Sequence, residues 1–296
     1  MNPSSEIQLA QLLDMTNPYA VLEEVKFNFI HFYPEIKFSV VRTAFDDFID
    51  LMDGKFPGYQ AANTKFHDKK HTTDGLIAIS RLIDGYNIEH TKKISVDLVI
   101  LSLVATIFHD AGYVQTRDDS SGTGAKYTQN HVERSIKFIE RYYQKLNMTK
   151  RDFNSMRNMI LCTELNYDLK KINFSSEEEK VLGFMLGTAD LLGQMSARTY
   201  LEKLLHLYYE FQEANIGGYE SEFDLLSKTI NFYEMVKIRL KKDLHNVQRY
   251  LVSHFWFRYK ISQDLYQVAI DRQINYLKKI LEHSPQNYKS RLKRKN

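Results

Sequence analysis

The sequence predicts an all-α protein, and three observations support this fold class. Apolar residues recur with a helical period along nearly the whole chain. The 296 residues include only 12 Gly and 5 Pro, which leaves few breaks and favours long helices over many turns. Capping residues also precede several apolar runs. A chain of this length can bury a large core, as one large helical domain or as two small ones.

Three helices are expected in the first third of the chain. The first covers residues 37–53 and ends at Gly54, and the second covers residues 71–85. The third begins near Ser95, whose side chain can cap a helix N-terminus. It contains the apolar run VDLVILSLVATIF, residues 96–108, which is typical of a buried helix.

A polar stretch interrupts this series of helices. Residues 116–128, with the sequence TRDDSSGTGAKYT, are rich in Gly, Ser and Asp and are expected to form a flexible loop. Loops often carry function, so one interpretation is a lid or a substrate-binding loop. The other interpretation is a simple connector.

Two cap signals mark the helices that follow. Thr149 with Asp152 fits the start of a helix that runs to about residue 165. Ser176 with Glu179 forms a capping box that opens the next helix. Further helices are expected over residues 129–146, 197–215, 221–244, 245–257 and 262–283, with a turn at 215–221.

Composition limits the classes of protein to consider. The net charge of +3 is too small to argue for a nucleic-acid partner. The single cysteine, Cys162, excludes an internal disulfide and a cysteine-based zinc site. The apolar run at residues 96–108 is too short to span a membrane, and the N-terminus lacks the features of a secretory signal. A cytoplasmic protein is therefore expected. Residues 286–296 form a basic tail that is expected to be disordered.

The apolar run ends in an imidazole and a carboxylate, those of His109 and Asp110. Burying a carboxylate is costly unless it is paired or binds a metal. His71 and Asp190 lie far away in the sequence, and each adjoins its own apolar helical segment. If these three helices converge, two imidazoles and two carboxylates form a site that suits Fe, Mn, Zn, Co or Mg. The alternative is a capping Asp next to a buried, hydrogen-bonded His.

This order, His then His-Asp then Asp, resembles the signature of the HD-domain metal-dependent phosphohydrolases. The resemblance covers about residues 60–200. It implies an HD-domain helical bundle with additional C-terminal helices. The bundle and the extension would form one domain over residues 1–285, with the core at 60–200 and the extension at 200–285. It also implies one or two divalent ions, held by His71, His109, Asp110 and Asp190.

The segment KFHDKKH is similar to the Tyr-His-Asn-x-x-His motif of class I cyclic-nucleotide phosphodiesterases. This likeness implies that His67 donates a proton to the leaving oxygen, whereas His71 binds metal. If the helix extends back to residue 67, the two imidazoles share one face. Asp190 stands in an Ala-Asp-Leu sequence, as the last metal ligand of those enzymes does. The alternative for His67 and His71 is a pair of polar loop histidines.

Further positions carry weaker likenesses to the same enzymes. Thr163 and Glu164 match their Ala-Thr-Asp-Met segment, and Gln194 closely follows the last ligand. His131 is similar in placement to a histidine on one of their helices, where it would support a ligand or act as an extra one. A polar contact at the surface or between helices is the alternative for Glu164 and His131. Tyr113 stands where many two-metal members carry His or Lys. The groups that could neutralise phosphate charge are His131, Arg134, Lys69 and Lys70.

The predicted activity is hydrolysis of a phosphoester in a small molecule such as a nucleotide or a cyclic nucleotide, by metal-activated water. Asp110 would also orient that water or bridge to a second ion. One rival is a di-iron oxygenase of the HD type, for which His131 and Glu164 are the spare ligands. The other is a non-catalytic helical binding or signalling module. The dense aromatic residues at 197–260 favour core packing, and a homodimer surface is the alternative.

Overall fold

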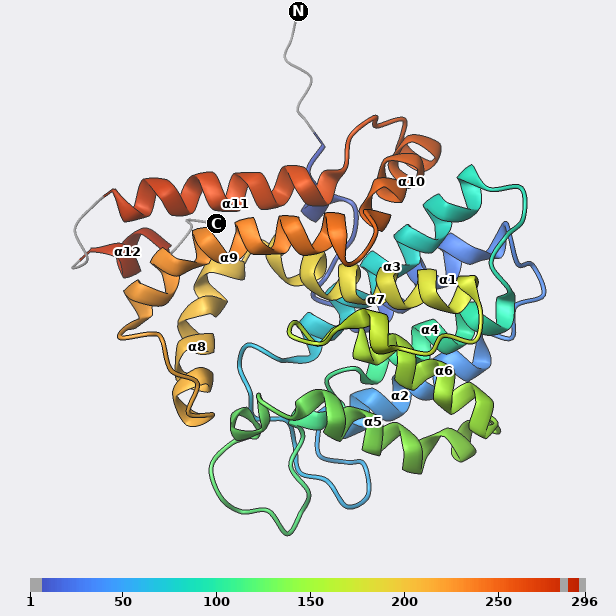
Figure 1. Ribbon diagram of the computed structural model, residues 1–296, viewed down its shortest axis with the longest axis horizontal. Coiled ribbons are helices and arrows are strands. Elements are labelled where there is room, and N and C mark those ends of the chain that lie inside the picture. The colour runs from blue at the N-terminus through green and yellow to red at the C-terminus, as the bar shows by residue number, and fades with distance from the viewer. Residues whose placement is uncertain (1–6, 283–286, 293–296) are drawn as a thin grey trace, which may run out of the picture.

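The computed structural model describes residues 7–282 and 287–292, and this part of the chain is all-α, as predicted (Figure 1). It contains α-helices joined by short 3-10 turns, and no strand occurs among the described residues. The bounds of the helices are α1 Pro18–Ile30, α2 Ser39–Met52, α3 Lys69–Glu89, α4 Val96–Phe108, α5 His131–Tyr142, α6 Lys150–Leu161, α7 Glu177–Ser196, α8 Tyr200–Glu213, α9 Glu222–Lys242, α10 Tyr250–Tyr259, α11 Leu265–Leu281 and α12 Tyr288–Leu292. The 3-10 turns are η1 Leu9–Gln11, η2 Ala111–Tyr113, η3 Gly124–Tyr127, η4 Tyr143–Leu146, η5 Leu169–Lys171 and η6 Val247–Arg249.

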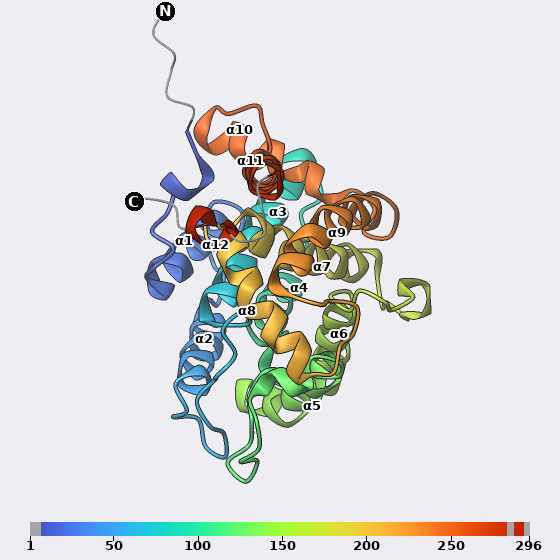
Figure 2. The same cartoon turned by 90° about the vertical axis from the view of Figure 1, so that its left-hand side faces the viewer.

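Helices α3, α4 and α7 lie in the middle of the molecule in both views of Figure 1 and Figure 2. Each of the three packs against the other two. Helices α1 and α10 cover α3, α2 and α6 cover α4, and α11 covers α7. The expected extension after residue 200 therefore packs on the central helices, since α10 and α11 contact α3 and α7 directly.

Helix α4 is the apolar run of the sequence, and nearly all of its second half is buried. The window Val96–Tyr113 is in fact long and apolar enough to cross a membrane by length and composition alone, which corrects the expectation that it was too short. However, 78% of this window is buried inside the protein. That burial is typical of the core helix of a folded domain, so the window is weak evidence for a membrane span.

One helix was not predicted and another ends earlier than expected, each for a local reason. Helix α1 was not predicted, although Asn17 and Pro18 mark its start: the Asn17 side chain accepts a hydrogen bond from the Tyr19 N–H. Helix α6 ends at Leu161 rather than near residue 165. The buried Arg239 of α9 donates hydrogen bonds to the carbonyl oxygens of Cys162, Glu164 and Leu165, and so replaces the intrahelical donors there.

The two cap signals have different outcomes. Thr149 and Asp152 form a complete capping box. The Ser176 side chain does accept a hydrogen bond from the Glu179 N–H, but the Glu179 carboxylate does not return to residue 176. It is fully buried and accepts hydrogen bonds from Ser155 and Asn158 of α6. Glu179 therefore joins α6 to α7, because a buried carboxylate needs buried donors.

The prediction of a disordered tail at residues 286–296 is wrong for residues 288–292, which form α12. Tyr288 and Leu292 are buried, and the Tyr288 hydroxyl donates a hydrogen bond to Glu222. These two apolar residues are four apart and share one helix face, a pattern that the basic composition of the segment obscured. Residues 1–6, 283–286 and 293–296 lie outside the described part of the chain. The expectation for the N-terminus falls partly on the first of these segments.

We expect Gly85→Ala to destabilise the fold. A Cβ atom at residue 85 would lie 1.9 Å from the carbonyl oxygen of Tyr250, so α3 and α10 could not pack as closely. Overpacking of this kind typically lowers the free energy of unfolding by about 1–3 kcal/mol, which urea denaturation would measure. Gly217→Ala is the matched control, because a Cβ atom there meets no atom within 4 Å. Equal stability of the two variants would contradict this account of the α3–α10 contact.

Candidate metal centre

Three helix ends or faces bring the four predicted ligands together. His71 lies in the first turn of α3, His109 ends α4 and Asp110 follows it, and Asp190 lies within α7. His71 Nε2 is 3.0 Å from Asp110 Oδ2 and 3.1 Å from Asp190 Oδ1. His109 Nε2 is 3.5 Å from each of the same two oxygens. The donor atoms of His71, His109 and Asp110 all lie within 4.8 Å of one another, so these residues could hold a metal ion.

The hydrogen bonds of the cluster leave the donor atoms available. The Nδ1–H of His109 faces the carbonyl oxygen of Thr106 at 2.7 Å, which places the lone pair on Nε2. His109 Nε2, Asp110 Oδ2 and Asp190 Oδ1 are all buried and form no hydrogen bond of good geometry, although His71 Nε2 lies beside both oxygens. Such atoms are costly to bury unless something satisfies them. Two imidazole nitrogens and two carboxylate oxygens that converge in this way fit a divalent cation.

Burial and neighbouring charges act in opposite directions on these groups. Burial disfavours the charged form of Asp110, but the imidazoles of His109 and His71 outweigh it and hold the pKa of Asp110 well below its usual range. The same balance, with His109 and His71, lowers the pKa of Asp190. Burial also opposes protonation of His71, yet the carboxylates of Asp110 and Asp190 raise the pKa of His71 to about 10. A protonated His71 ring therefore neutralises part of the negative charge of the two carboxylates, as a bound cation would.

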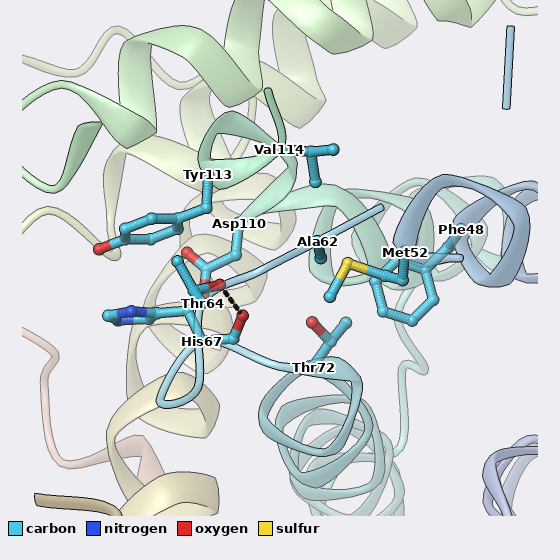
Figure 3. Close-up of a pocket in the computed structure, with 9 residues that line it drawn as sticks. All are labelled: Phe48, Met52, Ala62, Thr64, His67, Thr72, Asp110, Tyr113 and Val114. Atoms are coloured by element: carbon cyan, nitrogen blue, oxygen red, sulfur yellow. Dashed lines mark hydrogen bonds between the residues drawn. The ribbon is translucent and has the colours of Figure 1, made fainter. Parts of the chain in front are cut away.

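The helix does not extend back to residue 67, so the condition for a shared helix face of His67 and His71 is not met: Asp68 caps α3 and the helix begins at Lys69. Asp68 accepts a hydrogen bond from the His71 N–H. The His67-Asp68 pair of the sequence therefore supplies a helix cap rather than metal ligands. The His67 ring still lies beside the cluster, with its centroid 5.5 Å from that of His71. Tyr113 stacks on it at 4.1 Å, as the close-up in Figure 3 shows next to Asp110.

Glu210 of α8 fixes the position of His67. Its carboxylate lies 2.8 Å from His67 Nδ1 and accepts hydrogen bonds from the N–H groups of Lys65 and Phe66. Burial opposes ionisation of Glu210, but the bond with His67 and the backbone donors outweigh it and lower its pKa. Sequence reasoning missed Glu210, because nothing in its amphipathic helix distinguishes it from a surface glutamate.

His131, at the start of α5, faces the other oxygen of Asp110. Its Nδ1 faces the Thr128 carbonyl oxygen at 2.7 Å, and its Nε2 lies 3.7 Å from Asp110 Oδ1. Gly112 makes this approach possible, since a Cβ atom there would lie 2.0 Å from the His131 carbonyl oxygen. Burial lowers the pKa of His131, and the charges of Asp110 and Glu164 oppose that shift. The structure thus brings His131 beside Asp110, whereas Glu164 acts on His131 only through its charge.

The predicted phosphate-neutralising cations each have a partner within the protein, and their role toward phosphate stays a prediction. Arg134 donates to the carbonyl oxygens of Gly112 and Val114, directly after the His-Asp pair. Lys70 is bonded to Asp74, one turn further along α3, and Lys69 pairs with Asp53. Each cation donates to a buried or partly buried acceptor that would otherwise lack a hydrogen bond. Of these candidates, only His131 turns its free ring nitrogen toward the cluster.

Two further predicted positions have modest roles. The Thr163 hydroxyl donates a hydrogen bond to the Ile160 carbonyl oxygen and so closes the end of α6. Gln194 lies one helical turn after Asp190, on the same side of α7.

The cluster is largely buried. The side chains of His71 and His109 are 4% and 2% exposed, and those of Asp110 and Asp190 are 11% and 15% exposed. A cavity of about 10 Å³ adjoins Asp110, which is close to the minimum for one water molecule. Its wall is drawn in Figure 3 and consists of Phe48, Met52, Ala62, Thr64, His67, Thr72, Asp110, Tyr113 and Val114.

Comparison with known proteins adds one match. Residues 116–253 match a protein-family model described as Npun_R2479-like, a description that states no activity. The matched segment includes His131, Asp190 and Glu210, and begins after His71, His109 and Asp110. No curated protein and no solved structure matches the chain.

Proposed function

We propose that the protein is a cytoplasmic, metal-dependent phosphohydrolase that cleaves a phosphoester in a small molecule such as a nucleotide or cyclic nucleotide. One observation carries the proposal: buried donor atoms of His109, Asp110 and Asp190 form no hydrogen bond of good geometry and converge on His71 Nε2. The resemblance of these positions to the HD-domain phosphohydrolases supports the same assignment. An HD-domain bundle is accordingly the fold family that we propose.

The chain would divide the chemical work between two groups of residues. His71, His109, Asp110 and Asp190 would hold the ion, and a divalent ion there lowers the pKa of a bound water so that hydroxide is available near neutral pH. His67 would transfer a proton from Nε2 to the leaving oxygen, since Glu210 already engages its Nδ1. Tyr113, stacked on the His67 ring, would keep that ring in place.

A di-iron oxygenase is the second candidate, and the position of His131 favours it. Asp110 presents Oδ2 to His71 and Oδ1 to His131, so one carboxylate could bridge two ions. Glu164 is close enough for its charge to act on His131. Two irons per chain and an oxygen-dependent change in colour would favour this candidate over the phosphohydrolase.

Metal analysis of the purified protein, followed by a screen of phosphomonoesters, nucleotides and cyclic nucleotides, tests the proposal. We expect one or two divalent ions per chain and turnover of at least one phosphoester that stops on treatment with a chelator. Turnover that survives complete removal of the metal would contradict the proposal.

We expect metal affinity to fall as the pH decreases. With its pKa raised to about 10 by two carboxylates, the His71 ring is protonated at pH 7 when no metal is bound. A metal binds only the neutral imidazole, so binding must release that proton. Calorimetry in buffers of different ionisation enthalpy should show about one proton or more released per ion, with affinity falling by about tenfold per pH unit. A pH-independent affinity without proton release would remove His71 from the ligand set.

A further inference from the structure

The largely buried site raises the question of how a substrate enters. The cavity beside Asp110 holds about 10 Å³, whereas a phosphoester needs far more space. Binding of a phosphoester on this side of Asp110 would therefore require a segment at the cavity wall to move. Three described segments are bonded to one another beside the cavity wall: the loop at residues 63–67, the segment at residues 116–128 and the C-terminal end of α8.

The segment at residues 116–128, here called the strap, is not the loosely held loop expected from its composition. The Gln115 side chain donates to the Ser121 carbonyl oxygen, and Lys126 and Tyr127 both bind the Asp119 carboxylate. Within the strap, η3 is a regular turn capped by Thr123. These bonds hold the strap in one conformation. The Gln60 side chain also donates to the carbonyl oxygens of Thr116 and Asp119, so the start of the strap is tied to the loop before α3 and its later residues are the part that can lift.

The strap lies directly on the wall of the cavity. A Cβ atom at Gly124 would lie 1.9 Å from the Tyr113 carbonyl oxygen and 3.4 Å from Thr64, and both residues line the cavity. The Gly124 N–H also donates a hydrogen bond to the Asn63 side chain. Lifting the strap would therefore uncover the cavity beside Asp110.

Helix α8 holds the strap in place through one residue. The Glu213 carboxylate accepts a hydrogen bond from the Thr123 hydroxyl at 2.6 Å and another from the Thr123 N–H. Glu210, three residues earlier, holds the loop at residues 65–67 from the same helix. One face of α8 thus binds both the strap and the loop at residues 65–67.

The C-terminal end of α8 is less firmly packed than its N-terminal end. The apolar residues that bury this helix, Tyr200, Leu201, Leu204 and Tyr208, all lie in its first nine positions. Beyond Tyr208 the buried residue of the helix is Glu210, and Phe211 is only partly buried against the core, so polar bonds contribute more at this end than at the start of the helix. The turn that follows contains Gly217 and Gly218, the latter with φ +94°. Water can replace hydrogen bonds at small net cost, whereas buried apolar anchors have no such replacement.

We propose that the strap and the C-terminal end of α8 form a gate over the candidate metal centre, and that the Thr123–Glu213 contact is its latch. Release of the latch separates the strap from α8 and opens the cavity beside Asp110. Glu210 then remains with His67, so the positioned imidazole is kept while the site is open. This gate belongs to the fold itself, and the proposal holds whichever ion or reaction the site supports.

The gate can be tested without metal or turnover. Thr64→Cys places a thiol in the cavity wall beneath the strap, where an anionic aromatic disulfide reagent reaches it only when the gate is open. The labelling rate of the introduced thiol, followed by peptide mass spectrometry, should rise by about tenfold when Glu213→Ala is added, because two hydrogen bonds are lost. Thr123→Val should raise the rate less, since it removes only the hydroxyl contact.

Two controls separate gating from general loosening. Glu220→Ala removes an equal charge from the exposed turn after α8 and should leave the rate unchanged. The native Cys162 is fully buried away from the cavity and should stay unlabelled in every variant. An unchanged labelling rate in the Glu213→Ala variant would overturn the proposal. Labelling of Cys162 in parallel with the introduced thiol would overturn it too, because the whole fold would then be opening.

Discussion

Replacing His109 or Asp110 with alanine should abolish metal retention while the helical fold persists. Each change removes a donor atom that is buried and forms no hydrogen bond of good geometry in the protein. Mutation of a residue that only hydrogen-bonds to a metal ligand typically lowers metal affinity by about 10–100-fold. Loss of a ligand itself should therefore lower it by at least about 100-fold. Elemental analysis after gel filtration measures the retained metal, and far-UV circular dichroism measures the helix content.

His254 provides a matched control for the His109 variant. It is fully buried, and its Nδ1 lies 2.6 Å from the Asp84 carboxylate, so it is also a buried imidazole beside a carboxylate. His254→Ala should lower stability and leave the metal content unchanged. The ligand assignment is wrong if the His109 and Asp110 variants keep their metal, or if all three variants lose it equally.

His67→Ala should keep the metal and lose turnover by about 100-fold or more, the usual scale of general acid catalysis. The structure supports this separation, because Glu210 rather than the ligand cluster engages the His67 ring through Nδ1. The loss should shrink for substrates that release p-nitrophenolate, since that group departs without a proton. Steady-state rates on matched alkyl and p-nitrophenyl esters measure the difference.

Glu210→Gln should reproduce part of this effect. The amide can still accept the N–H groups of Lys65 and Phe66, but the carboxylate that faces His67 is gone. The variant should keep its metal and show the same dependence on the leaving group with a smaller loss. Equal losses on good and poor leaving groups would remove the acid role of His67. Loss of metal from the His67→Ala variant would instead make His67 a ligand.

The sequence was informative where a polar residue interrupts an apolar run. His109 and Asp110 end the most apolar helix of the chain, and Asp190 lies inside another, so burial alone marked them as unusual. Helical periodicity likewise predicted most of the helices. Their convergence on His71 needed three helices far apart in the sequence to pack together, which the motif order indicated and periodicity alone does not.

The parts that the sequence did not reveal depend on long-range partners. Glu210 approaches His67 across 143 positions of the chain, and a single glutamate on an amphipathic helix carries no local signal. Arg134 and Lys70 seemed available for phosphate because their acceptors, the Gly112 carbonyl oxygen and Asp74, become apparent only after packing. The strap was expected to be flexible from its Gly, Ser and Asp content, whereas Glu213, 90 residues away from Thr123, fastens it.

The most direct test of the metal centre is a crystal structure of the purified protein with anomalous diffraction recorded at the absorption edge of the metal found by elemental analysis. We expect an anomalous peak within about 2.0–2.4 Å of the Nε2 atoms of His71 and His109 and of carboxylate oxygens of Asp110 and Asp190. A fully loaded protein whose peak lies elsewhere, or whose four side chains bind each other with no peak between them, would contradict the account.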